Sequence, residues 1–220
     1  MLSLVRSWKF LALGALTVSA VLFSLIAGNI LAGDPLAILD AAVASTLHAH
    51  SDPALTLLML AVTHAHGTLA VTGYSAALAL YLAKRREWHW VAATGLAVPV
   101  GLLINVLLKH LFRRARPVFE EPLLTLSTYS FPSGHTAGTT LLYGVVAAYV
   151  FSRTRDARVR LGCVATWIFM VVLVAFSRVY LGVHYLTDVV AAVTWSLAWL
   201  ALCVLAARSL QTHFSHRRSD

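Results

Sequence analysis

The sequence predicts an all-α protein that crosses a membrane six times, as a helix bundle with both termini in the cytoplasm. Three observations predict this fold class. The 220 residues are 59% hydrophobic and only 12% charged, whereas about a quarter of the residues of an average soluble domain are charged. The chain contains six apolar stretches of the roughly 20 residues that a transmembrane helix needs. Most lysines and arginines lie at the ends of these stretches.

The first stretch follows Arg6 and Lys9, as a signal peptide would. Its apolar part exceeds the roughly 7 to 15 residues of a signal core and no clear cleavage site follows, so we expect a retained span. Basic residues lie at or just beyond the ends of the later spans. The predicted ranges are Phe10–Ala32, Ala54–Ala83, Trp88–Phe112, Pro132–Ser152, Leu161–Gly182 and His184–Arg208. No repeat of about 20–50 residues and no linker interrupts them, so residues 1–220 are expected to form one domain.

The lysines and arginines predict the orientation. Short cytoplasmic loops are enriched in these residues, and 12 of the 17 lie on the side that holds both termini. Both termini are therefore expected in the cytoplasm. A charge at the other boundary usually has a function, and the five cations there are Lys109, Arg113, Arg114, Arg116 and Arg178.

Two further classes are disfavoured. The net charge of +8 does not indicate a nucleic-acid partner, because the cations lie at the ends of apolar stretches and not on one polar surface. Cys163 and Cys203 lie within apolar stretches and lack the spacing of a disulfide framework or a zinc site. We expect both to be small core residues.

Alternating spans bring four helix ends to the outer face, and each of these ends has polar residues. The third span ends with Lys109 and is followed by Arg116, the fourth begins with Ser133, Gly134 and His135, the fifth ends with Arg178, and the sixth begins with His184 and Asp188. Counting the spans alone therefore predicts one site near the outer interface.

These residue types suit a phosphoryl group. Lys109, Arg116 and Arg178 can bind its non-bridging oxygens. Ser133 and Gly134 open a helix, where unpaired backbone N–H groups and the helix dipole favour an anion. The cations and the helix start could thus stabilise negative charge, which is the first requirement of a phosphoryl-transfer site.

The remaining residues suit a two-step reaction. His184 and Asp188 are four residues apart and share one face of a helix, so the carboxylate can accept Nδ1–H and leave Nε2 free to attack. His135 can protonate the leaving group and then activate water. This pattern predicts a phosphoenzyme intermediate.

Each cluster also has a simpler interpretation. Ser133 and Gly134 also suit close helix packing, and His184 with Asp188 also suits an interfacial pair. A metal site of His135, His184 and Asp188 is the sharper alternative. Three adjacent cations would repel a divalent metal, so no metal is expected.

Other polar residues are expected to lie outside the site. Arg113 and Arg114 are expected to face solvent or lipid headgroups. The two HAH triplets, His48–His50 and His64–His66, are expected in loop or packing roles, because neighbours two apart diverge on a helix. The loop Phe119–Phe131 is long, and we hypothesise a lid or an interfacial surface.

Three motifs resemble the signature of the type 2 phosphatidic acid phosphatase superfamily. They are K-x6-R-P at Lys109–Pro117, P-S-G-H at Pro132–His135 and S-R-x5-H-x3-D at Ser177–Asp188, in the order and spacing of that family. The resemblance covers residues 109–188 directly, and the six-span plan extends it over nearly the whole chain.

The resemblance implies a role for each matching residue. His184 would be the nucleophile, Asp188 would orient it, and His135 would be the general acid and then the base. The phosphate would be bound by Lys109, Arg116, Ser133, Gly134 and Arg178. The resemblance implies no metal cofactor.

By this resemblance we expect an integral membrane phosphatase whose partners are membrane lipids and a lipid phosphate: phosphatidic acid, phosphatidylglycerol phosphate, diacylglycerol pyrophosphate or undecaprenyl pyrophosphate. Two alternatives stay open, a lipid phosphotransferase that uses the same site and a non-catalytic protein that binds or transports lipid phosphates. The sequence does not choose among these lipids or predict an oligomeric state. The short loops favour a bacterial inner membrane, with the site facing the periplasm or the cell exterior.

Overall fold

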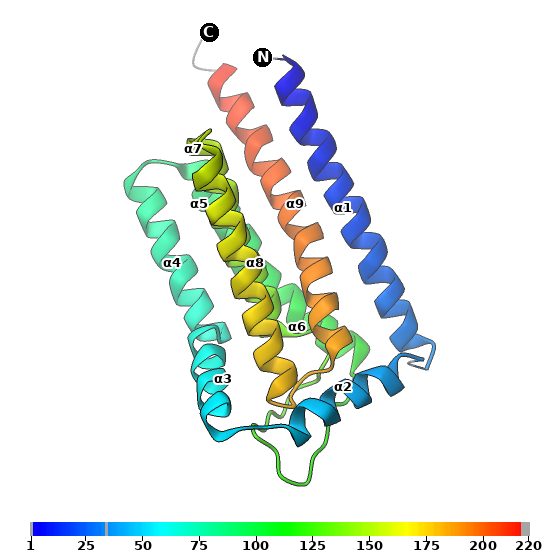
Figure 1. The fold of residues 1–220 in the computed structure, drawn as a ribbon. Coiled ribbons are helices and arrows are strands. Elements are labelled where there is room, and N and C mark those ends of the chain that lie inside the picture. Colours follow the sequence, from blue (N-terminus) through cyan, green and yellow to red (C-terminus); the bar gives the residue numbers. More distant parts are fainter. Residues whose placement is uncertain (1, 34, 217–220) are drawn as a thin grey trace.

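The computed structural model describes residues 2–33 and 35–216, and these ranges contain helices and no strand. Figure 1 shows a bundle in which the start of α1 and the end of α9 lie at one end, while α2 and a long loop lie at the other. The helices are α1 (Leu2–Leu31), α2 (Ala37–Ala49), α3 (Pro53–Ala65), α4 (Thr68–Lys84), α5 (Trp88–Gly95), the π-helix η1 (Leu96–Val100), α6 (Gly101–Phe112), α7 (Gly134–Arg153), α8 (Ala157–Tyr180) and α9 (Leu186–His216).

Several of these helices are long and apolar enough to cross a membrane. Four segments qualify, namely Ala12–Leu31, Trp88–Phe112, Ala157–Tyr180 and Leu186–Ala207, and α3 with α4 makes a fifth if the bent pair is one span. The remaining predicted span coincides with α7, whose 20 residues include threonines and glycines in the first turns and are less apolar. The protein is therefore an all-helical membrane protein, and the count of six and the cytoplasmic termini stay predictions.

Two features were not predicted. The predicted span Ala54–Ala83 is two helices that meet at an angle of 46°, because Gly67 has an extended backbone (φ −64°, ψ 161°) between them. The segment Ala37–Ala49 forms α2, which has 13 residues and is too short to cross the roughly 30 Å of hydrocarbon. It packs instead against α8 and α9.

The helix α7 is the centre of the bundle and packs against α4, α6, α8 and α9. Close approach to α8 requires a glycine, since a Cβ on Gly144 would lie 2.8 Å from Cζ2 of Trp167. The indole of Trp167 also donates a hydrogen bond to the Thr140 carbonyl (3.0 Å). These contacts fix α7 in the bundle and so fix the place of its first residues.

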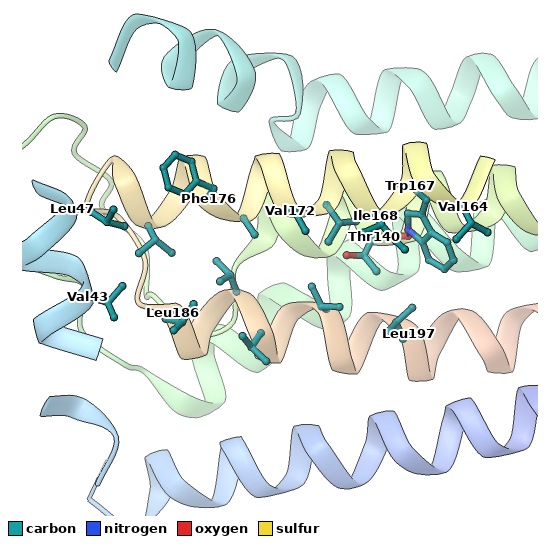
Figure 2. Close-up of a pocket in the computed structure, with 16 residues that line it drawn as sticks. Val43, Leu47, Thr140, Val164, Trp167, Ile168, Val172, Phe176, Leu186 and Leu197 are labelled. Carbon is teal, nitrogen blue, oxygen red and sulfur yellow. The ribbon is translucent and has the colours of Figure 1, made fainter. Parts of the chain in front are cut away.

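An apolar cavity of about 650 Å³ lies between α8 and α9 and extends to α2 (Figure 2). Val43 and Leu47 of α2 bound one end, where Leu186 opens α9, and Trp167 and Leu197 line it deeper in the bundle. The cavity therefore begins beside the first turn of α9, which also contains Asp188.

Candidate active site

The backbone carbonyls of residues 128–130, in the loop after α6, accept hydrogen bonds from two of the predicted cations. Lys109, in the last turn of α6, donates from Nζ to the carbonyl oxygens of Tyr129 (2.6 Å) and Ser130 (3.0 Å). Arg116 donates from Nε to the Thr128 carbonyl (2.6 Å) and from its second terminal nitrogen to the Tyr129 carbonyl (3.1 Å). The C-terminal part of the loop Phe119–Phe131, which we hypothesised to be a lid, is thus hydrogen-bonded to these cations.

Arg178 is the third predicted cation and is completely buried. One terminal nitrogen donates to Oγ1 of Thr63 in α3. Its Nε and its other terminal nitrogen have no hydrogen-bond partner among the described residues. The charges of Lys109 and Arg116 act on one another and on Arg178. We call these three residues the cation cluster. A buried guanidinium with two unused donors beside two further cations is suited to an anion.

The start of α7 lies where the sequence predicts it. Ser133 is the N-cap residue (φ −69°, ψ 117°) and Gly134 is the first helical residue. The buried Asn105 of α6 donates from Nδ2 to the carbonyl of Pro132 (3.3 Å), which follows a cis peptide bond. A Cβ on Gly134 would lie 3.4 Å from the same Nδ2. Backbone N–H groups at this helix end are therefore available to an anion.

His135 lies in the first turn of α7, within electrostatic reach of all three members of the cation cluster. A Cβ on Gly67 would lie 3.7 Å from its Nε2. The imidazole therefore faces the bend between α3 and α4. This places the imidazole at the edge of the cation cluster, and its role in proton transfer stays a prediction.

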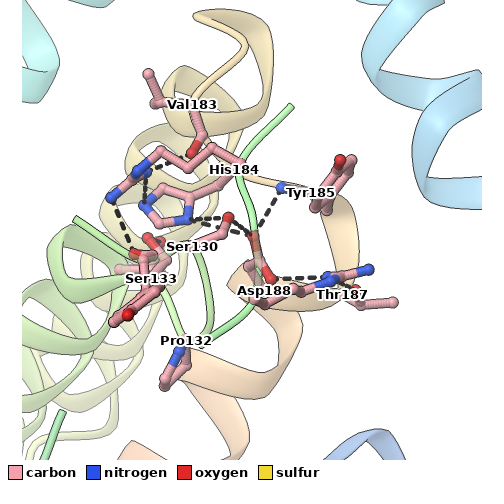
Figure 3. A network of polar contacts seen from close by, with 12 residues as sticks. Ser130, Pro132, Ser133, Val183, His184, Tyr185, Thr187 and Asp188 are labelled. Carbon is pink, nitrogen blue, oxygen red and sulfur yellow. Dashed lines mark hydrogen bonds and ion pairs between the residues drawn. The ribbon is translucent and has the colours of Figure 1, made fainter. Parts of the chain in front are cut away.

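His184 and Asp188 meet, although not as two residues of one helix. The helix α9 begins at Leu186, so His184 lies in the turn before it. Its Nδ1 is 3.3 Å from Oδ2 of Asp188. The same oxygen accepts the backbone N–H of Tyr185 (2.9 Å), the contact of a capping box in which a first-turn side chain bonds back to the N-cap residue (Figure 3). Helix capping thus holds the carboxylate beside the imidazole.

His184 is buried, with 1% of its surface exposed. Burial first, and then the positive charges of Arg178, Lys109 and Arg116, hold the pKa of His184 well below its usual value. The imidazole is therefore neutral near pH 7, and the Asp188 carboxylate favours the tautomer with the proton on Nδ1. The free Nε2 is 3.3 Å from a terminal nitrogen of Arg116 and so faces the cation cluster.

Arg114 was expected to face solvent or headgroups, and this expectation is wrong. Its side chain is buried, and its two terminal nitrogens lie 2.8 Å from Oδ1 of Asp188 and 2.8 Å from Oδ2 of Asp40 in α2. Two buried carboxylates meet at this point and require a cation. The neighbouring Arg113 is exposed, as expected.

Sequence reasoning also missed Asp40 and Ser130. Ser130 donates from Oγ to Oδ2 of Asp188. A signal existed for Asp40, since a carboxylate within an apolar stretch at a membrane boundary favours a functional role. Ser130 lies in a loop whose path depends on tertiary contacts, and no local pattern marks it.

The other expectations concern metals, cysteines and the HAH triplets. Within residues 2–33 and 35–216, no three His, Cys, Asp or Glu side chains lie together as metal ligands would. Cys163 and Cys203 are free thiols. His48 stacks on Phe119 (ring centroids 4.0 Å apart), and His66 bonds the Val62 carbonyl (3.0 Å), which are packing roles.

The comparisons with known proteins agree on one family. The model of the PAP2 superfamily matches residues 88–211, more than half of the chain. The chain is 38% identical over 94 residues to phosphatidylglycerophosphatase B of Bacillus subtilis, which is 40% of this chain and 43% of that protein. It is 35% identical over 111 residues to decaprenylphosphoryl-5-phosphoribose phosphatase of Mycobacterium tuberculosis, which is 48% of this chain and 53% of that protein. The matched segments thus span about half the length of these curated relatives or less.

Two solved structures share the fold. The crystal structure of a transmembrane PAP2-type phosphatidylglycerolphosphate phosphatase from Bacillus subtilis matches with a TM-score of 0.72 and 25% identity, over 86% of this chain and 93% of that chain. Aquifex aeolicus LpxE matches with a TM-score of 0.57 and 20% identity, over 78% of this chain and 95% of that chain. The second likeness concerns the fold alone.

Proposed function

Because the chain belongs to the PAP2 superfamily, we propose that it is an integral membrane phosphatase that hydrolyses lipid phosphates through a phosphohistidine intermediate. The relatives named as lipid phosphatases support the reaction class. The helical membrane fold supports a lipid substrate.

One observation carries the proposal, the orientation of the His184 imidazole. Its Nδ1 lies 3.3 Å from the Asp188 carboxylate and its Nε2 lies 3.3 Å from the Arg116 guanidinium. A neutral imidazole so held has its lone pair on the side where the cations would hold a phosphoryl group. A simple interfacial pair would have no need of the three cations on the other side of the ring.

In the first step, Nε2 of His184 attacks phosphorus, and the bond from phosphorus to the lipid oxygen breaks. Lys109, Arg116 and Arg178 stabilise the charge on the equatorial oxygens, together with the N–H groups at the start of α7. His135, in its protonated imidazolium form, gives a proton to the departing oxygen and becomes neutral. The product is phosphohistidine and a lipid with a free hydroxyl or one phosphate fewer.

In the second step, His135 takes a proton from water, and the resulting hydroxide attacks the phosphohistidine. The bond from phosphorus to Nε2 breaks, and inorganic phosphate leaves. Asp188 stabilises the positive charge that the imidazole acquires while it is phosphorylated. Every proton in this cycle has a donor and an acceptor among His135, water and the substrate.

The positions of His184 and His135 favour one location for the hydrocarbon part of the bound lipid. An in-line displacement puts the leaving oxygen opposite Nε2 of His184 and next to His135, which faces the bend at Gly67. The cavity between α8 and α9 lies instead on the side of the His184 ring that faces Asp188. Val43 of α2 bounds this cavity, and Asp40 of the same helix is linked to Asp188 through Arg114. We therefore propose that the hydrocarbon part of the lipid substrate lies beside the bend between α3 and α4 and not in that cavity.

The test is phosphate release by purified protein from a panel of lipid monophosphates and pyrophosphates. His184→Ala is expected to abolish release while the protein stays folded in detergent. His89→Ala, at the far end of the bundle, is the matched control and retains release. A chelator has no effect, and adding a lipid acceptor distinguishes transfer from hydrolysis by the product formed. Normal turnover of His184→Ala, or a chelator effect that a divalent metal reverses, contradicts the proposal.

A further inference from the structure

The guanidinium of Arg114, which occupies a variable position of the first motif, bridges two buried carboxylates next to His184. One terminal nitrogen of Arg114 donates to Oδ1 of Asp188 (2.8 Å) and to Oγ1 of Thr187 (2.7 Å). The other donates to Oδ2 of Asp40 (2.8 Å). Its guanidinium carbon also lies 4.4 Å from the ring centre of Tyr185. Arg114 therefore contacts Tyr185, Thr187 and Asp188, at the turn into α9.

Asp40 fastens α2 to the same helix end. Its Oδ1 accepts the backbone N–H of Thr187 (3.0 Å), and its Oδ2 accepts the Thr187 hydroxyl. Thr187 is the second residue of α9, so Asp40 caps this helix from a residue 147 positions away in sequence. Asp40 is completely buried, and within residues 2–33 and 35–216 the cation that pairs with its carboxylate is Arg114.

These contacts leave the Asp188 carboxylate little freedom. Oδ1 is held by Arg114, and Oδ2 by the Ser130 hydroxyl and the Tyr185 backbone N–H. The weakest of its contacts is the 3.3 Å one to Nδ1 of His184. The direction of the carboxylate, and with it the direction of the imidazole, is therefore set by groups that do not touch the substrate.

The charges reinforce this geometry. Asp40 and Asp188 bind the same guanidinium, and two carboxylates that share a buried site repel one another strongly unless a cation lies between them. Without Arg114, this repulsion would turn the Asp188 carboxylate away from Nδ1–H of His184, and the orientation that leaves Nε2 free would be lost. If Asp40 were absent, the whole charge of Arg114 would act on Asp188 and weaken its support of the imidazolium.

We propose that Asp40 and Arg114 are positioning residues that hold the Asp188 carboxylate turned towards His184. The proposal rests on the phosphatase function proposed above. It extends the catalytic unit from the motif residues to α2, a helix outside all three motifs.

The test compares Asp40→Asn, Arg114→Gln and the double variant, with kcat expressed per orthovanadate-binding site so that unfolded protein does not count. Arg114→Gln is expected to lower kcat by about 100-fold. This is the upper end of the loss of activity that follows when a residue that orients a functional side chain is replaced. Asp40→Asn lowers kcat by about tenfold, and KM changes less than about twofold in both because the phosphate contacts remain. The control Glu87→Gln removes the ion pair to Arg153 (3.0 Å) at the far end and leaves kcat unchanged.

The double variant separates positioning from mere stability. It removes the second carboxylate together with the cation, so no uncompensated charge at Asp40 repels the Asp188 carboxylate, and the kcat of the double variant exceeds that of Arg114→Gln by about tenfold. If Arg114→Gln does not fold, Thr187→Val replaces it and is expected to lower kcat about threefold by removing only the hydroxyl that links Arg114 to Asp40.

Two results overturn the proposal: an unchanged kcat per site in Arg114→Gln or its substitute, or a double variant that folds and is no more active than Arg114→Gln. Absence of phosphate release by the wild-type protein would instead refute the phosphatase function itself.

Discussion

Replacing Arg178 by methionine is expected to make the protein more stable and catalytically inactive. The guanidinium is completely buried, and two of its nitrogens have no partner among the described residues. Each unsatisfied buried donor costs about 1–3 kcal/mol, whereas the bond to Thr63 that is lost contributes about 1 kcal/mol. Methionine fills a similar volume without polar groups, so the free energy of unfolding rises by at least about 1 kcal/mol.

The assay is thermal unfolding in detergent, with and without orthovanadate. For a chain of this size, about 1 kcal/mol corresponds to roughly 2–4 °C in Tm. Arg178→Met is expected to unfold at least about 2 °C higher than the wild type, to gain nothing from orthovanadate and to release no phosphate.

A matched control is Arg160→Met, because this arginine bonds the carbonyls of Thr154 (2.9 Å) and Phe151 (3.0 Å). Its loss lowers Tm and leaves catalysis intact. A lower Tm for Arg178→Met would refute the reasoning, since it would mean that the guanidinium serves the fold.

Two further predictions concern pH and orientation. Since the pKa of His184 lies well below its usual value near 6.5, this residue stays neutral as the pH falls through 6.5. The acidic limb of kcat/KM, corrected for the ionisation of the substrate, is expected below pH 6.5, and a limb at or above that value contradicts a neutral buried nucleophile. For orientation, a cysteine at Val118, 91% exposed in the loop beside the site, should react with an impermeant maleimide in intact cells. Cysteine at Arg155 should react only after lysis, and the reverse pattern would invert the proposed topology.

The helices and their meeting point were accessible from the sequence for simple physical reasons. Apolar length predicts where helices lie, and alternating direction predicts that Lys109, His135, Arg178 and His184 share one end of the bundle. The structure brings these residues together through helix ends, which depend little on the details of side-chain packing.

The missed features depend on contacts between distant segments. The sequence places Arg114 next to Arg113, and nothing local distinguishes a buried cation from an exposed one. Its burial follows from the carboxylates of Asp40 and Asp188, each 74 positions from it. The split of the second predicted span depends on a single backbone conformation at Gly67, which an apolar stretch does not reveal.

The link between Asp40 and Thr187 has a consequence for biosynthesis. Its partners are 147 residues apart, so the contact closes only after α9 has left the ribosome and has joined α2. Earlier insertion intermediates contain the cation cluster in part but lack the turn with His184. The proposed hydrolytic activity is therefore expected to appear in one step when α9 has joined α2, and phosphate release would then report that assembly step in the membrane.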